Sequence, residues 1–529
     1  MNEPSAPTPP TTIPWMGLLA VLLGTFISTL NTRLSNFGLA DIRGAVHAGF
    51  DEGAWISTAL TVGQMLIAPV AIWAGGAFGA RRVLIGAAGS LAIIASIEPL
   101  ATNLHTLLTL QFASGLATGF FVPLTLSFVL RNTPPKVWAY GIALYALNLE
   151  VSLNISASLE GWYLEHLSWA FIFWQNVPLA VGMVLCLRFG VRPDPVNPSR
   201  PPADIFGLAS GGGGLALIYA ALDQGNRLDW GNSGLVWGLM LSGAILIVAF
   251  LIHESRTRHP GVDLKVVFAS PLPRLLLLIA FLRLTILSTA YAIPQFLQVV
   301  RGFRALEVGQ TLVWIAVPQL LVCVAAGYLL RRSDPRVIAS VGFLFICIAC
   351  LQVAYGLTPL WGTDQFLPSQ LLQAVGQSFA LSGTIFFAIL HLKPQDALTF
   401  GAATQVARLM GGEVGQAFIT TLIRVREQVA SNLLGLHVQI GDAQTLQRLQ
   451  TYAAVTARAG DPSSAPARGA AVLGSVVRSV ATTQGIIDGF VVIAALTALT
   501  LILIATRRAA PVGPASHVSP FAPRDVSPT

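Results

Sequence analysis

Charged side chains are scarce in this sequence of 529 residues. Only 10% of the residues are Asp, Glu, Lys or Arg, whereas 54% are hydrophobic. A soluble globular domain usually has about 25% charged residues, so a water-soluble fold of this size could not cover so much apolar side chain. The composition excludes an ordinary soluble protein and predicts a chain that is dissolved in a lipid bilayer.

Lysine and cysteine are also rare. The net charge of +7 is carried mainly by arginine, and the basic residues lie in short clusters between apolar runs. One continuous basic patch is absent, which argues against a nucleic-acid partner. The four cysteines have the spacing of neither a metal site nor a disulfide framework, and we expect them to pack in the core. The lysines are Lys136, Lys265 and Lys393, and the cysteines are Cys186, Cys323, Cys347 and Cys350.

Motifs of catalysis and cofactor binding are missing from the sequence. It contains no HExxH zinc motif, no nucleophile elbow and no phosphate-binding loop. We therefore expect neither an enzyme nor an ATP-driven pump, and we expect no metal and no cofactor. Residues 1–14 are polar and rich in proline, without a basic segment ahead of the first apolar run, so no cleavable signal peptide is expected.

Long apolar runs dominate the remaining sequence. Crossing the hydrocarbon layer takes roughly 20 residues of helix, and helices are expected because lipid offers no partner to open backbone groups. Fourteen runs qualify. They lie at 15–36, 53–75, 83–101, 106–130, 137–160, 169–189, 204–223, 233–253, 272–298, 307–330, 336–356, 366–391, 396–423 and 483–506.

Arginine and lysine are distributed unequally between alternate short loops. One set of loops holds only Arg43, Arg227, Arg301 and Arg304, and the other set holds most of the remaining basic residues. Cytoplasmic loops are enriched in positive charge, so the second set of loops is predicted to be cytoplasmic. Both termini then lie in the cytoplasm, and the protein spans the plasma membrane. This set comprises Arg81, Arg82, Arg131, Lys136, Arg188, Arg192, Arg200, Arg256, Arg258, Lys265, Arg274, Arg331, Arg332, Arg336 and Lys393.

A proline-rich segment at residues 193–202 divides the chain after six runs. The pattern predicts an all-α polytopic membrane protein with two six-helix bundles and a two-helix hairpin between them, a plan in which transporters bind substrate between the repeats. A long outer loop, 424–482, is interpreted either as a mobile cap or as a docking surface for a periplasmic partner. The expected units are an N-terminal tail 1–14, a bundle 15–190, a linker 191–203, a hairpin 204–253, a bundle 272–506 and a tail 507–529.

Several motifs resemble the fourteen-span drug:proton antiporters of the EmrB/QacA type, a branch of the major facilitator superfamily. They are Leu-Asp-Gln-Gly-Asn-Arg-Leu-Asp-Trp at 222–230, His-Pro-Gly-Val-Asp-Leu at 259–264, Phe-Ile-Phe-Trp-Gln-Asn-Val-Pro at 171–178 and Ile-Pro-Gln-Phe-Leu-Gln at 293–298. The resemblance implies two bundles around a central cavity and export of amphiphilic compounds against inward proton flow. It also implies a periplasmic adaptor protein and an outer-membrane channel as partners in a bacterium with two membranes.

The residues that usually couple this family to protons are altered here. Asn31 stands where the family has an aspartate, and Gln111 replaces an arginine. The span-five motif is lost, and the loop after span two retains only Gly79, Arg81 and Arg82 of its gating motif. Three functions therefore stay open: proton-coupled export, an uncoupled facilitator or importer of small organic acids, and a transporter-like receptor or structural protein.

Ionisable residues within the first six spans are candidate functional groups, because a charge at mid-membrane is costly. Arg33 lies in span one, and Glu150 and Glu160 lie in span five. We expect Arg33 to pair with one of the two glutamates, either as a structural ion pair or as a substrate and proton site. Glu150 is the deeper glutamate and the first candidate for proton coupling.

The second bundle has its own buried charges: Arg283 in span nine, and Arg408 and Glu413 in span thirteen. Arg408 matches an arginine that is often present in the family. We favour a structural ion pair as the role of Arg408. Arg33 and Arg283, on opposite bundles, would attract an anionic amphiphile. We also expect Glu98 and His391 to be interfacial. The prolines within the spans are expected to kink or flex their helices, namely Pro69, Pro123, Pro178, Pro294 and Pro318.

Overall fold

The computed structural model describes residues 15–132, 138–191, 203–257, 261–262, 264–268, 272–390, 397–439, 441–458 and 462–506. Every regular element in these ranges is helical. The predicted tails, the proline-rich segment 193–202, and the residues Lys136, Arg258, His391 and Lys393 lie outside the described residues.

The N-terminal half consists of long helices joined by short connections. Two short helices, α2 and α3, follow the first long helix, and α9 precedes the last one. The bounds are α1 Trp15–Phe37, α2 Leu39–Ala45, α3 Phe50–Gly53, α4 Trp55–Phe78, α5 Ala80–Ile97, α6 Leu104–Thr118, α7 Phe121–Asn132, α8 Trp138–His166, α9 Phe171–Trp174 and α10 Asn176–Gly190.

The remaining helices begin with a hairpin, α11 and α12, and a short helix, α13. The bounds are α11 Ile205–Gly225, α12 Gly234–Arg256, α13 Leu264–Phe268, α14 Leu272–Thr285, α15 Ile293–Val299, α16 Ala305–Arg332, α17 Pro335–Gly356, α18 Leu367–Ile389, α19 Ala397–Gly435, α20 Ala443–Arg458 and α21 Ala465–Ala505.

Thirteen helical segments of the described chain are long and apolar enough to cross a membrane. They correspond to all the predicted spans except the thirteenth, 396–423. A helix does exist there, because α19 covers it, but α19 carries Arg408, Glu413 and Arg424 and is too polar to qualify. It packs against α4, α7, α14 and α21, which shield much of its surface. The chain is a multi-pass membrane protein.

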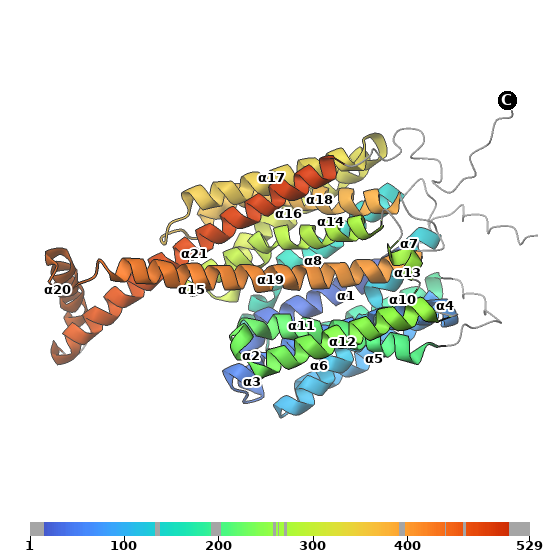
Figure 1. Ribbon diagram of the computed structural model, residues 1–529, viewed down its shortest axis with the longest axis horizontal. Helices are drawn as coiled ribbons and strands as arrows, with labels where there is room; N and C mark the ends of the chain where they lie inside the picture. The colour runs from blue at the N-terminus through green and yellow to red at the C-terminus, as the bar shows by residue number, and fades with distance from the viewer. Residues whose placement is uncertain are drawn as a thin grey trace, which may run out of the picture.

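The long helices run side by side along one direction, and α20 lies beyond them at one end (Figure 1). We call this end of the molecule the α20 end. The segment 424–482, predicted to be a loop, is instead largely helical, because α19 continues to Gly435 and α21 begins at Ala465. Both helices extend past the other helices toward α20 (Figure 1).

Contacts between α8 and α16 and between α7 and α19 join the two halves of the chain. At Gly161, a Cβ atom would lie 2.5 Å from the backbone nitrogen of Leu306, and at Gly309 it would lie 2.4 Å from that of Ser158. Small residues allow membrane helices to approach this closely. The hairpin is attached to the N-terminal half through α11, which packs on α4.

Candidate functional site

A polar cavity of about 100 Å³ lies where α1, α4, α8, α11, α14 and α19 meet. It is lined by residues from both halves of the chain and from the hairpin. We call it the polar cavity. Its lining residues are Thr32, Arg33, Asn36, Ser57, Thr61, Leu153, Tyr219, Asp223, Arg283, Ile286, Leu287, Ala290, Arg408, Leu409, Gly412, Glu413 and Gln416.

Three arginines from three helices face this cavity: Arg33 of α1, Arg283 of α14 and Arg408 of α19. Arg283 is close enough to the other two to interact electrostatically with both. The Nε atom of each arginine is buried and has no hydrogen-bond partner. Among the ion pairs formed by described residues, none includes any of the three. The cavity therefore holds three guanidinium groups with open donors, and the acids Asp223 and Glu413 line it as well.

Arg408 and Arg33 are positioned by neutral acceptors. Arg408 donates from Nη1 to the Thr29 hydroxyl at 3.2 Å and from Nη2 to Gln405 Oε1 at 2.9 Å. Arg33 donates from Nη2 to the backbone carbonyl of Ala290 at 3.0 Å, and its guanidinium carbon lies 4.9 Å from the centre of the Phe37 ring. We favoured a structural ion pair between Arg408 and an acid. Among the described residues, Arg408 instead forms hydrogen bonds with neutral acceptors.

The carbonyl that binds Arg33 is made available by Pro294. An α-helical residue normally donates its N–H to the carbonyl four residues earlier, and proline has no N–H. Pro294 therefore leaves Ala290 without its usual donor. The helix changes there as predicted: α14 ends at Thr285, a π-helical turn spans Ser288–Ala292, and α15 follows.

The expected pairing of Arg33 with Glu150 or Glu160 is wrong. Glu150 of α8 is fully buried, neither carboxylate oxygen has a hydrogen-bond partner, and its electrostatic neighbours are Arg283 and Arg408. Glu160 is also buried, and its charged neighbour is Asp41 of α2. Thus Glu150 lies beside the arginines of the polar cavity, whereas Glu160 lies outside the cavity.

Asn31 and Gln111 do not line the cavity either. The amide of Asn31 donates to the Ser114 hydroxyl at 3.3 Å and accepts a hydrogen bond from Asn176 Nδ2 at 3.0 Å. Gln111 is fully buried, and both polar atoms of its side chain lack a partner. The substitutions that remove the family's charges thus leave a neutral polar cluster between α1, α6 and α10. Glu98, expected at the interface, is also fully buried.

Two ionisable cavity residues were missed by the sequence interpretation, Tyr219 and Asp223 of the hairpin helix α11. Asp223 accepts hydrogen bonds from the Thr58 hydroxyl and, at 3.1 Å, from Gln224 Nε2. Tyr219 is an electrostatic neighbour of Glu413, which lines the same cavity. Asp223 belongs to the motif at 222–230, and its position at the end of an apolar span was the signal that could have identified it.

The rest of that motif fixes the hairpin to its neighbours. Trp230 Nε1 donates to the Thr421 hydroxyl of α19 at 3.0 Å, and Arg227 forms an ion pair with Asp51 at 2.7 Å. A hydrogen bond from Asn232 and the nearby guanidinium of Arg424 hold the pKa of Asp229 below its ordinary value. Asp229 is the acceptor for Arg424 at 3.4 Å. The loop thus keeps α11 against α19, where both helices face the polar cavity.

The predicted gating loop is a tight connection between α4 and α5. Gly79 has a φ angle of +85°, which favours glycine. Arg81 donates from Nε to the carbonyl of Leu187 and from Nη2 to that of Arg188, both at 3.0 Å. These carbonyls lie in the last turn of α10, where helices leave acceptors unsatisfied. Arg82 forms none of the hydrogen bonds or ion pairs found among the described residues.

Comparison with known proteins places this architecture in a family. The sequence profile of the Major Facilitator Superfamily matches residues 21–416. The chain belongs to the Major Facilitator Superfamily. It is therefore a transporter of this superfamily rather than an enzyme, and the all-helical fold predicted from the sequence is confirmed.

Individual relatives are distant but cover most of the chain. The probable multidrug resistance protein EmrY of Escherichia coli is 27% identical over 78% of this chain and 81% of its own length. The fatty acid resistance protein FarB of Neisseria gonorrhoeae is 22% identical over 79% of this chain and 83% of its own. The fold matches the crystal structure of an autoinhibited POT-family peptide transporter with a TM-score of 0.55, at 14% identity, over 94% of this chain and 98% of that one.

A double-mutant cycle tests the role of Pro294. Replacing Arg33 by Ala in the natural sequence leaves the Ala290 carbonyl without a donor, which costs about 1–3 kcal/mol. In a Pro294→Ala background the new backbone N–H occupies this carbonyl, so we expect Arg33→Ala to cost measurably less. Unfolding free energies in detergent give the coupling between the two sites.

The matched control for this cycle uses Pro318, which lies inside α16. Pro318→Ala should show no coupling to Arg33→Ala. Equal costs of Arg33→Ala in the natural and Pro294→Ala backgrounds would contradict the assignment.

Proposed function

We propose that this transporter exports small amphiphilic anions by alternating access, with the polar cavity as the substrate site. The observation that carries the proposal is the set of three arginines, Arg33, Arg283 and Arg408, that face one cavity without a carboxylate partner. They come from both halves of the chain, so a bound anion contacts both halves at once. Transporters of this type rock the two halves about a site between them.

The energetics of buried charge favour an anionic ligand. An uncompensated buried ion costs several kcal/mol, and the guanidinium fork matches a carboxylate in a two-point hydrogen bond. The cavity also has apolar walls at Leu153 and Ile286. The names of two relatives, a multidrug resistance protein and a fatty acid resistance protein, support an amphiphile as the substrate.

Proton coupling is assigned to Glu150. Its carboxylate is buried among apolar helices, lacks hydrogen bonds and interacts with Arg283 and Arg408. An anion bound to these arginines competes with Glu150 for their charge. Substrate binding therefore favours the protonated form of Glu150 and substrate release favours the ionised form. This positive linkage carries the anion and the proton in the same direction, as proton-anion co-transport rather than antiport.

The first test concerns Arg283, which faces the cavity and forms no ion pair within the described residues. Arg283→Gln removes charge-assisted hydrogen bonds worth about 1.5–3 kcal/mol, so we expect the affinity for laurate to fall about 10- to 100-fold. Equilibrium binding to the purified full chain measures the change. The control, Arg256→Gln, removes an exposed arginine at the end of α12 and should leave binding unchanged. Unchanged laurate binding by Arg283→Gln would remove the arginines from the substrate site.

The second test concerns coupling. In proteoliposomes, Glu150→Gln is expected to abolish the response of laurate flux to an imposed pH gradient while laurate still binds. The control is Glu165→Gln, on the exposed end of the same helix. A natural protein whose flux ignores the pH gradient would favour the alternative of an uncoupled facilitator. A Glu150→Gln variant that retains the natural response would exclude Glu150 as the coupling residue.

The orientation that fits this function places the α20 end in the periplasm of a bacterial inner membrane, with both termini cytoplasmic. The units 15–190, 204–253 and 272–506 then form two six-helix bundles and a hairpin. We also assign the α20 end to an adaptor protein of an export assembly that includes an outer-membrane channel. Apolar side chains are exposed there: Leu436 is 65% exposed, Val455 61% and Leu446 42%.

One cysteine variant tests both assignments. We expect Val455→Cys to react with a membrane-impermeant maleimide in intact cells and to cross-link to a co-expressed periplasmic adaptor. A cysteine at Phe268 of α13, at the opposite end, should react only after the cells are opened. Protection of Val455→Cys in intact cells would reverse the orientation. Maleimide labelling without any adaptor cross-link would reject the docking surface alone.

A further inference from the structure

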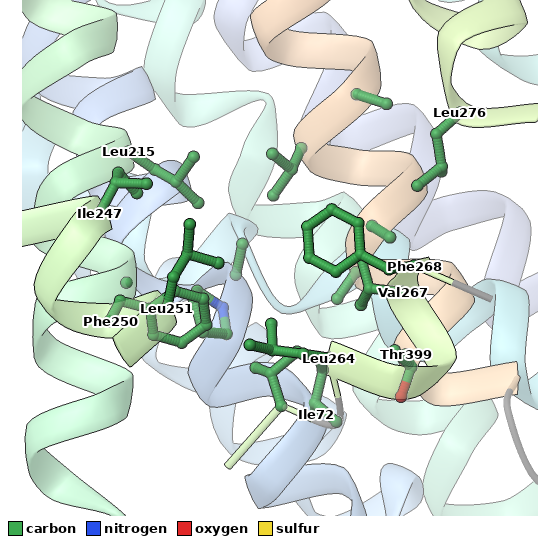
Figure 2. A pocket seen from close by; sticks show the side chains of 18 residues that line it. Ile72, Leu215, Ile247, Phe250, Leu251, Leu264, Val267, Phe268, Leu276 and Thr399 are labelled. Carbon is green, nitrogen blue, oxygen red and sulfur yellow. The ribbon is translucent and has the colours of Figure 1, made fainter. Parts of the chain in front are cut away.

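A second cavity, apolar and about 310 Å³ in volume, lies between the hairpin, α13 and helices α4, α14 and α19. We call it the apolar pocket. Figure 2 shows Ile247 and Phe250 of α12 on one side and Phe268 of α13 with Leu276 of α14 on the other. Thr399 is the one residue with a polar side chain among those that line it. Such a cavity suits hydrocarbon and offers almost nothing to water or to a polar ligand.

The pocket is accessible from the bilayer. Four of the helices in its walls, α4, α11, α12 and α14, are long and apolar enough to cross the membrane, and Phe268 of α13 is 63% exposed. The short helix α13 contacts α12, α14 and α19 and lies near the end opposite α20 (Figure 1).

Four helices line both this pocket and the polar cavity: α4, α11, α14 and α19. On α19, Ala407 faces the pocket and the next residue, Arg408, faces the polar cavity. On α11, Leu215 and Tyr219 face the pocket and the cavity respectively, and four residues of helix correspond to about 6 Å. The two cavities are thus neighbours along the same walls, one apolar and one rich in arginine.

An apolar cluster lies between the two cavities. Met65 of α4 and Tyr219 of α11 pack there with Leu409 and Met410 of α19. Methionine side chains are flexible and adapt to irregular space, so this cluster can yield to a chain that passes between the cavities.

We propose that the apolar pocket binds the hydrocarbon tail of a single-chain amphiphile whose anionic head group is held by Arg283 and Arg408 in the polar cavity. The inference rests on the proposed function and narrows the substrate class to single-chain acids such as fatty acids. The position of the arginines relative to the apolar pocket favours this occupant over a membrane phospholipid. The arginines lie on the side of the pocket toward the protein interior, whereas a phospholipid keeps its head group at the membrane surface.

Photolabelling of the full chain in lipid nanodiscs locates the tail. The probe is laurate with a diazirine at its terminal carbon. We expect it to label residues of α12, α13 and α19 around the apolar pocket, and an excess of unlabelled laurate to remove this labelling. Labelling confined to other helices, or labelling that laurate does not displace, would overturn the assignment.

Filling the pocket tests the same point by affinity. Ala403→Phe fills the pocket from α19, and Ile247→Trp fills it from α12. Both should lower laurate affinity at least about tenfold, because the tail loses buried methylene groups. Binding of butyrate, which reaches only the arginines, should be unchanged and shows that each variant is folded. The control is Val414→Phe, on the same helix but 49% exposed to the bilayer.

The outcomes separate this inference from the export proposal. Unchanged laurate affinity in both filled variants overturns the tail site, even if the natural protein transports laurate. Native mass spectrometry gives a second outcome that overturns the tail site. In that outcome the natural protein retains a phospholipid, Ala403→Phe loses it, and the laurate affinity stays constant. Laurate bound in the pocket but not moved across proteoliposomes would reject export and leave the tail site in place.

Discussion

The structure depends on holding three arginines inside a membrane protein without matching carboxylates. Arg33 and Arg408 are positioned by a backbone carbonyl, a hydroxyl and an amide, all of them neutral acceptors. Neutral acceptors orient a guanidinium without cancelling its charge, so the balance of charge at the arginines is left to the nearby acids and to a bound anion. Burying uncompensated charge is unfavourable, and the protein recovers this cost only when an anion or the ionised Glu150 interacts with the arginines. The site is therefore built for exchange rather than for permanent pairing.

The hairpin is part of this site. A peripheral hairpin would leave the cavity to the two bundles alone, yet Tyr219 and Asp223 of α11 line it. The contacts of Trp230 with Thr421 and of Asp229 with Arg424 hold the hairpin loop on α19. Because α11 also borders the apolar pocket, movement of α19 against the hairpin would reshape both cavities together. Two helices beyond a twelve-helix plan thus contribute a polar wall and an apolar one.

The hydropathy of the sequence predicted much of the fold, but it did not predict much of the candidate site. In a bilayer the backbone groups of a single segment are satisfied only within a helix. Long apolar runs therefore predicted the positions of thirteen spans. The charge argument identified Arg33, Arg283, Arg408 and Glu413 as cavity residues because buried charge is rare. It assigned the wrong partner to Arg33, because opposite charge was considered and a carbonyl freed by Pro294 was not. Tyr219 was missed because an aromatic residue in an apolar run looks like packing.

The segment 424–482 shows why polarity alone misleads in a membrane protein. Its composition resembles a solvated loop, but α19 and α21 continue through most of it and pack on each other. The polar residues of α19 serve two environments: Arg408 and Glu413 face the cavity, whereas Arg426 pairs with Asp488 of α21 at 2.5 Å. One continuous helix therefore connects the polar cavity to the exposed α20 end. A rigid helix transmits rotation along its whole length, so any change at the arginines that turns α19 must also move the surface proposed for the adaptor.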